Sequence, residues 1–308
     1  MSSNKILIIR GGAIGDFILT LPVLAALRAQ LPKARLEVLG YPHIAQLALA
    51  GKLCSAVRSI DARPLAGFFA RKGALDPALE EYFAGFAIVI SYLFDPDEIF
   101  QTNVARCSKA QFIAGPHRPD ETAGIHATKV FLKPLERLAI FDADPEPKLA
   151  INSPHTTINQ IALHPGSGSE RKNWPEENWL ELLRQLTSQT DLTFLLVGGE
   201  AEGERLERLA TGLPVGRAAV ARNLPLPELA LRLHSCRAFL GHDSGITHLA
   251  AAVGLPGLVL WGDTIETVWR PQSARLKILR DPGGLPQLPV TTVRAELENL
   301  LRQTHAAW

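Results

Sequence analysis

Apolar residues along the chain gather in short runs that alternate with stretches of helical periodicity. The runs lack the regular polar positions of a half-exposed strand, which is typical of parallel strands covered on both faces. In the first half of the chain this pattern predicts strands at 5–10, 35–40, 56–60, 86–92 and 111–115. A helix is predicted from Asp16 to Gln30. The first half therefore reads as one doubly wound α/β unit.

The alternation stops at residues 142–157, where Asp, Pro, Ser and Thr follow one another without a period, and this stretch is predicted to be a linker. Strands are then predicted at 160–164, 193–198, 218–222, 238–241, 257–261 and 276–279. We expect an N-terminal Rossmann-like domain at 1–150, a C-terminal Rossmann-like domain at 158–290, and a last helix within 291–308. Because open parallel sheets bind ligands at the carboxyl ends of their strands, the two domains are expected to face a central cleft.

The composition limits the possible functions. Apolar residues make up 46% and charged residues 20% of the 308 positions, which is ordinary for a folded domain. The formal net charge is +1, so no overall field attracts nucleic acid or an anionic membrane. Three cysteines without a CxxC pair favour a reducing cytoplasm over a disulfide or zinc framework. The long apolar run at 249–261 is interrupted by Gly and Pro and is too short to span a bilayer.

The first candidate segment is Arg10-Gly-Gly-Ala-Ile-Gly-Asp16, a predicted strand that leads through a glycine-rich turn into a helix. Gly12 and its neighbours would let the turn pass close to a ligand. Asp16 falls at the start of the helix, where the helix dipole keeps a carboxylate ionised. The spacing fits a catalytic base and a helix cap equally well.

The second segment, His164-Pro-Gly-Ser-Gly-Ser-Glu-Arg-Lys172, follows the first predicted strand of the second domain. The hydroxyls of Ser167 and Ser169 and the charge of Lys172 suit an anion, although the spacing is not that of a P-loop. The alternative is an ordinary solvated loop.

The third segment begins at Asp243, where a strand ends and an alanine-rich helix starts. Backbone N–H groups around Ser244 and Gly245 would be available to phosphate, and His248 lies on the same face of the first turn. The alternatives are a plain cap for Asp243 and a structural histidine for His248.

Two weaker signals remain. Asp95-Pro-Asp97 has the form of the D-x-D that holds a divalent ion in some sugar-transfer enzymes, but Asp97 also suits the cap of the next helix. Glu202 follows a strand and could accept hydrogen bonds from a ribose or simply favour a helix start. We predict no metal site.

In this order and spacing, the segments resemble the ADP-heptose:lipopolysaccharide heptosyltransferase family of glycosyltransferases. The residues that carry the resemblance are Gly15-Asp16, Thr20-Leu-Pro22, His164-Pro-Gly-Ser-Gly, Lys172-Asn-Trp-Pro175, Gly198-Gly-Glu-Ala-Glu202, Leu226-Pro-Glu-Leu229, Asp243-Ser-Gly-Ile-Thr-His248-Leu-Ala-Ala-Ala252 and Trp261-Gly-Asp-Thr264. The resemblance implies a GT-B architecture, in which the last helix packs back on the N-terminal domain. It also implies inverting transfer of a sugar without metal or cofactor, with heptose as the expected sugar and ADP-heptose as the expected donor.

Carried over residue by residue, the resemblance makes Asp16 the general base, Lys172 the cation for the donor phosphates, Glu202 a ribose contact and Asp243 a donor-sugar contact. The diphosphate-binding turn then comprises Ser244, Gly245 and His248, while Gly12, Asp95 and Asp97 fall in the first domain, where the acceptor is expected. The implied partners are a nucleotide-sugar donor and a lipopolysaccharide-core or other cell-surface glycan acceptor, with at most peripheral membrane contact through the acceptor and no nucleic acid.

The chain departs from the family pattern at two positions, because His242 replaces a more usual Asn and Asp263 a more usual Pro. Two rival functions stay open. One is a nucleotide-sugar epimerase on the same fold, and the other is a catalytically silent nucleotide-sugar-binding protein.

Overall fold

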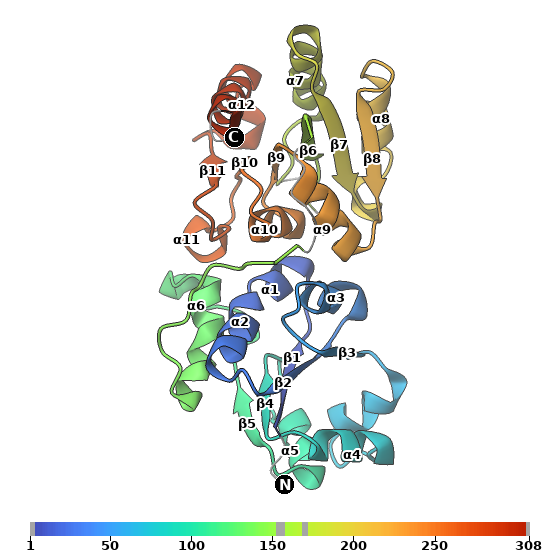
Figure 1. The fold of residues 1–308 in the computed structure, drawn as a ribbon, viewed down its shortest axis with the longest axis vertical. Coiled ribbons are helices and arrows are strands. Elements are labelled where there is room, and N and C mark those ends of the chain that lie inside the picture. The colour runs from blue at the N-terminus through green and yellow to red at the C-terminus, as the bar shows by residue number, and fades with distance from the viewer. Residues whose placement is uncertain (1–3, 152–157, 168–171, 306–308) are drawn as a thin grey trace. The chain divides into compact units, whose positions relative to one another are not determined.

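The computed structural model describes residues 4–151, 158–167 and 172–305 of the chain. The chain separates into two compact units, Met1–Leu149 and Ala150–Trp308, and the division falls inside the predicted linker. Each unit is a parallel sheet with helices packed on it (Figure 1). The predicted α/β fold class with two doubly wound domains is therefore confirmed, while the way in which the units face each other stays a prediction.

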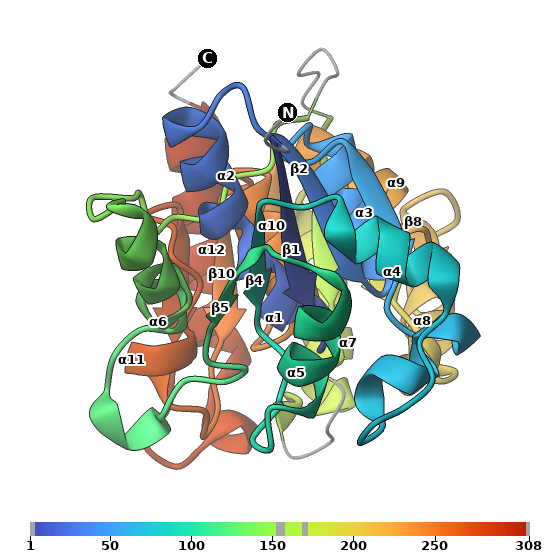
Figure 2. The ribbon, with the colours of Figure 1, turned by 90° about the horizontal axis from the view of Figure 1, so that it is seen from below.

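The described part of the first unit contains a five-stranded sheet in the order β3-β2-β1-β4-β5, and Figure 2 shows β5, β4, β1 and β2 side by side. The strands are β1 (Lys5–Arg10), β2 (Arg35–Gly40), β3 (Ala56–Ser59), β4 (Ile88–Ser91) and β5 (Gln111–Ala114). The helices are α1 (Ile14–Ile18), α2 (Leu21–Gln30), α3 (Pro42–Ala50), α4 (Pro77–Ala84), α5 (Ile99–Cys107) and α6 (Ala127–Leu132), with 3₁₀ turns at Arg63–Phe69, Glu121–Ala123 and Lys133–Leu138. All the strand pairs are parallel, and β1 lies at the centre between β2 and β4.

The core of the first unit is aromatic on one side of the sheet. Phe68, Phe83 and Phe100 pack together with ring centroids 4.8 to 6.2 Å apart and meet Leu7 and Ile9 of β1. α4 packs against α5 in this layer, whereas α1 packs with α3 and α2 with α6. The single helix predicted from Asp16 to Gln30 is wrong: it is split into α1 and α2.

The second unit contains, in its described residues, a six-stranded parallel sheet in the order β11-β10-β9-β6-β7-β8 (Figure 1). The strands are β6 (Gln160–His164), β7 (Thr193–Gly198), β8 (Ala218–Arg222), β9 (Ala238–His242), β10 (Gly257–Leu260) and β11 (Leu276–Leu279). The helices are α7 (Glu176–Gln189), α8 (Arg205–Thr211), α9 (Leu226–Ser235), α10 (Gly245–Ala252), α11 (Glu266–Trp269) and α12 (Val290–His305), with 3₁₀ turns at Glu200–Glu202 and Leu285–Gln287. This is the strand order of a dinucleotide-binding sheet, with its switch point between β6 and β9.

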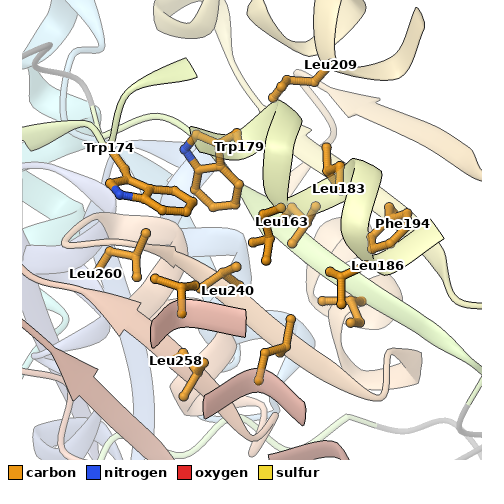
Figure 3. Packing of buried hydrophobic residues seen from close by; sticks show 14 of the residues in the cluster. Leu163, Trp174, Trp179, Leu183, Leu186, Phe194, Leu209, Leu240, Leu258 and Leu260 are labelled. Atoms are coloured by element: carbon orange, nitrogen blue, oxygen red, sulfur yellow. The ribbon is translucent and has the colours of Figure 1, made fainter. Parts of the chain in front are cut away.

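Two tryptophans anchor the core of this unit. Trp174 and Trp179 are buried with their ring planes 78° apart, beside Leu240 and Leu260 (Figure 3). The Trp174 indole N–H also donates to the carbonyl of Leu288 at 2.9 Å. The start of α7 is thereby fixed beside the carboxyl ends of the strands.

The last helix, α12, packs within the second unit. Val293, Leu297 and Leu301 belong to the same buried cluster as the tryptophans, and the helix contacts α7 and β10. Its expected packing on the first domain stays a prediction. Among the described helices, none has the length and apolar character needed to cross a bilayer.

Candidate functional site

Each sheet has a switch point where the chain leaves two neighbouring strands in opposite directions, between β1 and β4 in the first unit and between β6 and β9 in the second. Ligands of open α/β sheets bind at such points, outside the carboxyl ends of the strands. The sequence-predicted residues Gly12 and Asp16 follow β1, while Lys172 follows β6 and Asp243 follows β9. Ser169 lies outside the described residues.

Asp16 lies in the third position of α1, and its carboxylate turns back over the glycine-rich turn. Its Oδ2 accepts a hydrogen bond from the backbone N–H of Ala13 at 3.1 Å, as a cap does. Gly12 has a φ of 94°, and a Cβ there would lie 2.9 Å from Asp16 Oδ2. The Asp16 side chain nevertheless stays 29% exposed. The carboxylate is thus held in place and still accessible, so a capping role does not exclude a catalytic one.

Arg10, the last residue of β1, lies beneath this carboxylate. It is 3% exposed, and its Nη2 lies 3.5 Å from Asp16 Oδ1. Sequence reasoning missed this residue. The signal that could have revealed it is a charged side chain closing an otherwise apolar central strand, directly before a glycine turn.

The D-x-D aspartates have separate structural partners. Asp95 accepts hydrogen bonds from the backbone N–H groups of Phe100 and Gln101 at 3.1 and 3.0 Å, so it caps the start of α5. Asp97 forms an exposed ion pair with Arg71 at 3.1 Å. The helix cap expected at Asp97 therefore falls on Asp95. No group of three potential metal ligands occurs among the residues that the structure describes.

In the second unit, Lys172 and Asp243 meet although they are far apart in sequence. Lys172 Nζ lies 3.2 Å from Asp243 Oδ2, and the lysine side chain is 39% exposed. Ser167 donates to the side-chain oxygen of Asn173 at 2.7 Å, in the same loop as Lys172. An accessible cation and a carboxylate thus lie together at the switch point.

α10 begins directly after this pair. Ser244 caps the helix, because its Oγ accepts a hydrogen bond from the backbone N–H of Thr247 at 3.3 Å. The earlier N–H groups, from Gly245 onward, have no intrahelical acceptor and carry the positive end of the helix dipole. His248 is only 6% exposed. The turn can therefore receive an anion through its backbone, with His248 in the buried wall behind it.

Glu202 is turned inward, against a second glycine. Its Oε2 accepts from the N–H of Gly199 at 2.5 Å, and its Oε1 lies 3.6 Å from His164 Nε2. A Cβ at Gly166 would lie 2.0 Å from Glu202 Oε1, so any side chain at this position would displace the Glu202 carboxylate. His164 Nδ1 in turn lies 3.1 Å from Ser244 Oγ. A buried chain of polar groups therefore links Glu202 to the start of α10.

His242 completes the buried layer under the switch point. It is fully buried, and its Nε2 accepts the backbone N–H of Trp174 at 2.8 Å, so its proton is assigned to Nδ1. Burial, aided by the nearby His164, lowers the pKa of His242 to about 3. Burial also lowers the pKa of His164, although the Glu202 carboxylate opposes this shift. Both imidazoles are neutral at neutral pH, and sequence reasoning missed their structural roles.

This chain is similar in sequence to known heptosyltransferases. Residues 141–293 match the model of glycosyltransferase family 9 (heptosyltransferase). Lipopolysaccharide heptosyltransferase 1 of Pseudomonas aeruginosa is 38% identical over 130 residues, which cover 42% of this chain but only 33% of that protein.

Two solved structures share the fold over nearly the whole chain. The first is the ADP-heptose lipopolysaccharide heptosyltransferase II of Escherichia coli, with a TM-score of 0.78, 18% identity and 98% and 99% of the two chains covered. The second is the E. coli heptosyltransferase WaaC with ADP, with a TM-score of 0.76, 20% identity and 96% and 99% covered.

The fold places this chain in the class of two-domain α/β proteins with the GT-B type of fold. Within that class, residues 141–293 are similar to glycosyltransferase family 9, the heptosyltransferase family. The resemblance seen in the sequence is confirmed.

Proposed function

We propose that this chain is an inverting, metal-independent glycosyltransferase that transfers heptose from ADP-heptose to a lipopolysaccharide-core or other cell-surface glycan acceptor. The observation that carries the proposal is the meeting of Lys172 and Asp243 at the start of α10, inside the segment that matches the family. The solved E. coli relative with ADP supports an adenine nucleotide as the donor's leaving group. The relatives named for lipopolysaccharide support the acceptor class.

The second unit supplies the donor site in this proposal. A departing diphosphate gains negative charge, which Lys172 and the N–H groups at the start of α10 would stabilise. The diphosphate would compete with Asp243 for the lysine, and the released carboxylate could then accept hydrogen bonds from the donor sugar. Glu202 would accept from the ribose hydroxyls.

The first unit supplies the base. The acceptor hydroxyl oxygen attacks the anomeric carbon on the face opposite the diphosphate, and the bond from that carbon to the diphosphate oxygen breaks. The hydroxyl proton passes to the Asp16 carboxylate, so one displacement inverts the anomeric configuration. Lys172 and the dipole of α10 supply the positive charge that a metal ion would otherwise provide.

The test compares the wild-type enzyme with Asp16→Asn, using ADP-heptose and a lipopolysaccharide core that lacks its heptoses. ADP release and the anomeric configuration of the product are followed by NMR. Loss of general-base catalysis should lower kcat by about 10²- to 10⁴-fold, while the affinity for ADP, measured by calorimetry, stays unchanged.

The same experiment separates the rival functions. An altered ADP-sugar that forms without acceptor would identify an epimerase, and ADP binding without turnover on any core acceptor would identify a binding protein. Near-wild-type transfer by the Asp16→Asn variant would show that Asp16 is only a cap.

A further inference from the structure

The buried guanidinium of Arg10 has more contacts than a structural residue at the end of β1 requires. Its Nη1 donates to the carbonyl of His117 at 2.8 Å, and its Nη2 donates to the carbonyl of Asp16 at 3.3 Å. The same Nη2 lies 3.5 Å from the Asp16 carboxylate. One planar group therefore holds both the main chain and the side chain of Asp16, and ties them to a separate loop.

An aromatic wall fixes the guanidinium in turn. Its central carbon lies 4.4 Å from the ring centroid of Phe131 and 5.8 Å from that of Tyr92. Tyr92 is held in place by its own hydroxyl, which donates to the carbonyl of Phe131 at 2.6 Å. Packing against two ring faces leaves Arg10 little freedom to rotate, and cation–π attraction stabilises its charge where water is excluded.

Burying an arginine is costly unless its charge is used. Burial lowers the pKa of Arg10 below its usual range, while the nearby Asp16 acts in the opposite direction, and an arginine stays charged at any working pH. An apolar residue would satisfy a core position at the end of a central strand at a lower cost. The contacts to Asp16 explain why a cation is present here.

We propose that Arg10 is the positioning residue of the reaction, which aims the Asp16 carboxylate at the acceptor's proton. This proposal rests on the proposed function, in which Asp16 is the base. Arg10 touches neither the acceptor nor the donor, and it acts only through Asp16. Thr20 assists, because its hydroxyl donates to the same Asp16 carbonyl at 2.8 Å.

The test is a double-mutant cycle of Arg10→Met and Asp16→Asn. Methionine fills much of the space against Phe131 and Tyr92 without a charge. Because small misplacements of a catalytic group can cost about 10²-fold in rate, Arg10→Met alone should lower kcat by about 10- to 100-fold. In the Asp16→Asn background the same change should lower kcat by no more than about twofold, because residues that act as a unit are non-additive. ADP affinity should not change in any variant.

Two further variants control for simple loss of structure. Arg10→Lys keeps the positive charge but not the planar guanidinium with its several N–H donors. It should recover part of the kcat that Arg10→Met loses. Arg58→Met removes an exposed arginine that stacks on Tyr82 at 4.1 Å in the same unit, and it should leave kcat unchanged. If Arg10→Met fails to fold, the cycle is run with Arg10→Lys.

The outcomes separate the two proposals. Additive losses in the cycle, with Asp16→Asn itself strongly impaired, would overturn the role of Arg10 and leave the proposed function intact. Full activity of Asp16→Asn would instead overturn the assignment of the base. Equal kcat in Arg10→Met and wild type would also overturn the positioning role.

Discussion

Replacing His242 by Asn should make the second unit less sensitive to acid. The imidazole is fully buried and neutral, because its Nε2 accepts the N–H of Trp174 and burial lowers its pKa to about 3. An asparagine side chain offers an oxygen to the same N–H but has no titratable group. The variant therefore keeps a hydrogen-bond acceptor for the N–H of Trp174 but removes the group that can take up a proton.

The size of the effect follows from proton linkage. In the unfolded chain the histidine has a pKa near 6.5, so below that pH the unfolded state binds a proton that the folded state does not bind. The His242 contribution to the free energy of unfolding is therefore at its full value well above pH 6.5, and it decreases as the pH falls from 6.5 toward 3. Between pH 7.5 and 5 the loss from this one residue is about 2 kcal/mol. That is a large part of the 5–15 kcal/mol that stabilises a typical domain.

Urea denaturation followed by tryptophan emission measures this loss in the second unit alone, because all five tryptophans lie at or after position 174. At pH 7.5 the variant should be somewhat less stable than wild type, since the shorter side chain leaves a space. By pH 5 it should have lost about 2 kcal/mol less than wild type, with an unchanged urea dependence. His234→Asn, a half-buried histidine in the same unit, should keep the wild-type loss. Parallel losses in wild type and His242→Asn would refute this explanation.

Three further predictions concern the proposed activity. Lys172→Ala should weaken ADP binding about 10- to 100-fold and adenosine binding little, because a charged hydrogen bond acts on phosphate; equal losses in calorimetry would place Lys172 elsewhere. Gly12→Ala should lower kcat by displacing Asp16 Oδ2, whereas Gly124→Ala, at another positive φ of 64° with open space, should affect only stability; identical kinetics would disprove the displacement. Transfer should run at a similar rate in EDTA and in Mg²⁺ or Mn²⁺, and a rate that returns only with metal would contradict the phosphate-site assignment.

Much of the fold could be predicted because it depends on local pattern. Continuous apolar runs located the strands, with ends that differ by at most two residues from those in the structure. The split between α1 and α2 was missed because apolar residues continue through Ile18, Leu19 and Leu21 with helical spacing. Pro22 in the first turn of α2 carries no N–H for a bond to the preceding turn, and that is where the helix divides.

The residues of the candidate site could be predicted from the sequence, but the pairs that they form with one another could not. Asp16, Lys172 and Asp243 follow strand ends at the two switch points, which a sequence pattern can locate. Their partners are set by packing instead: Lys172 meets Asp243 across 71 positions, and Trp174 meets His242 across 68. Contacts between residues so far apart in the chain produce no recognisable pattern in the local sequence.

The two switch points are built in the same way but differ in the charge of one buried side chain. In each, a carboxylate lies over the end of the first strand where a Cβ on a glycine would displace it: Gly12 lies against Asp16, and Gly166 against Glu202. The last residue of that strand then supplies a buried nitrogen group facing the carboxylate.

In the first unit this group is Arg10, which is permanently charged, and in the second it is His164, which burial keeps neutral. A permanent cation suits a carboxylate that must be ionised before it accepts a proton. A neutral imidazole adds no charge beside a carboxylate that only has to accept hydrogen bonds from ribose hydroxyls. The difference between the two nitrogen groups therefore matches the proposed division between a reacting carboxylate in the first unit and a binding carboxylate in the second.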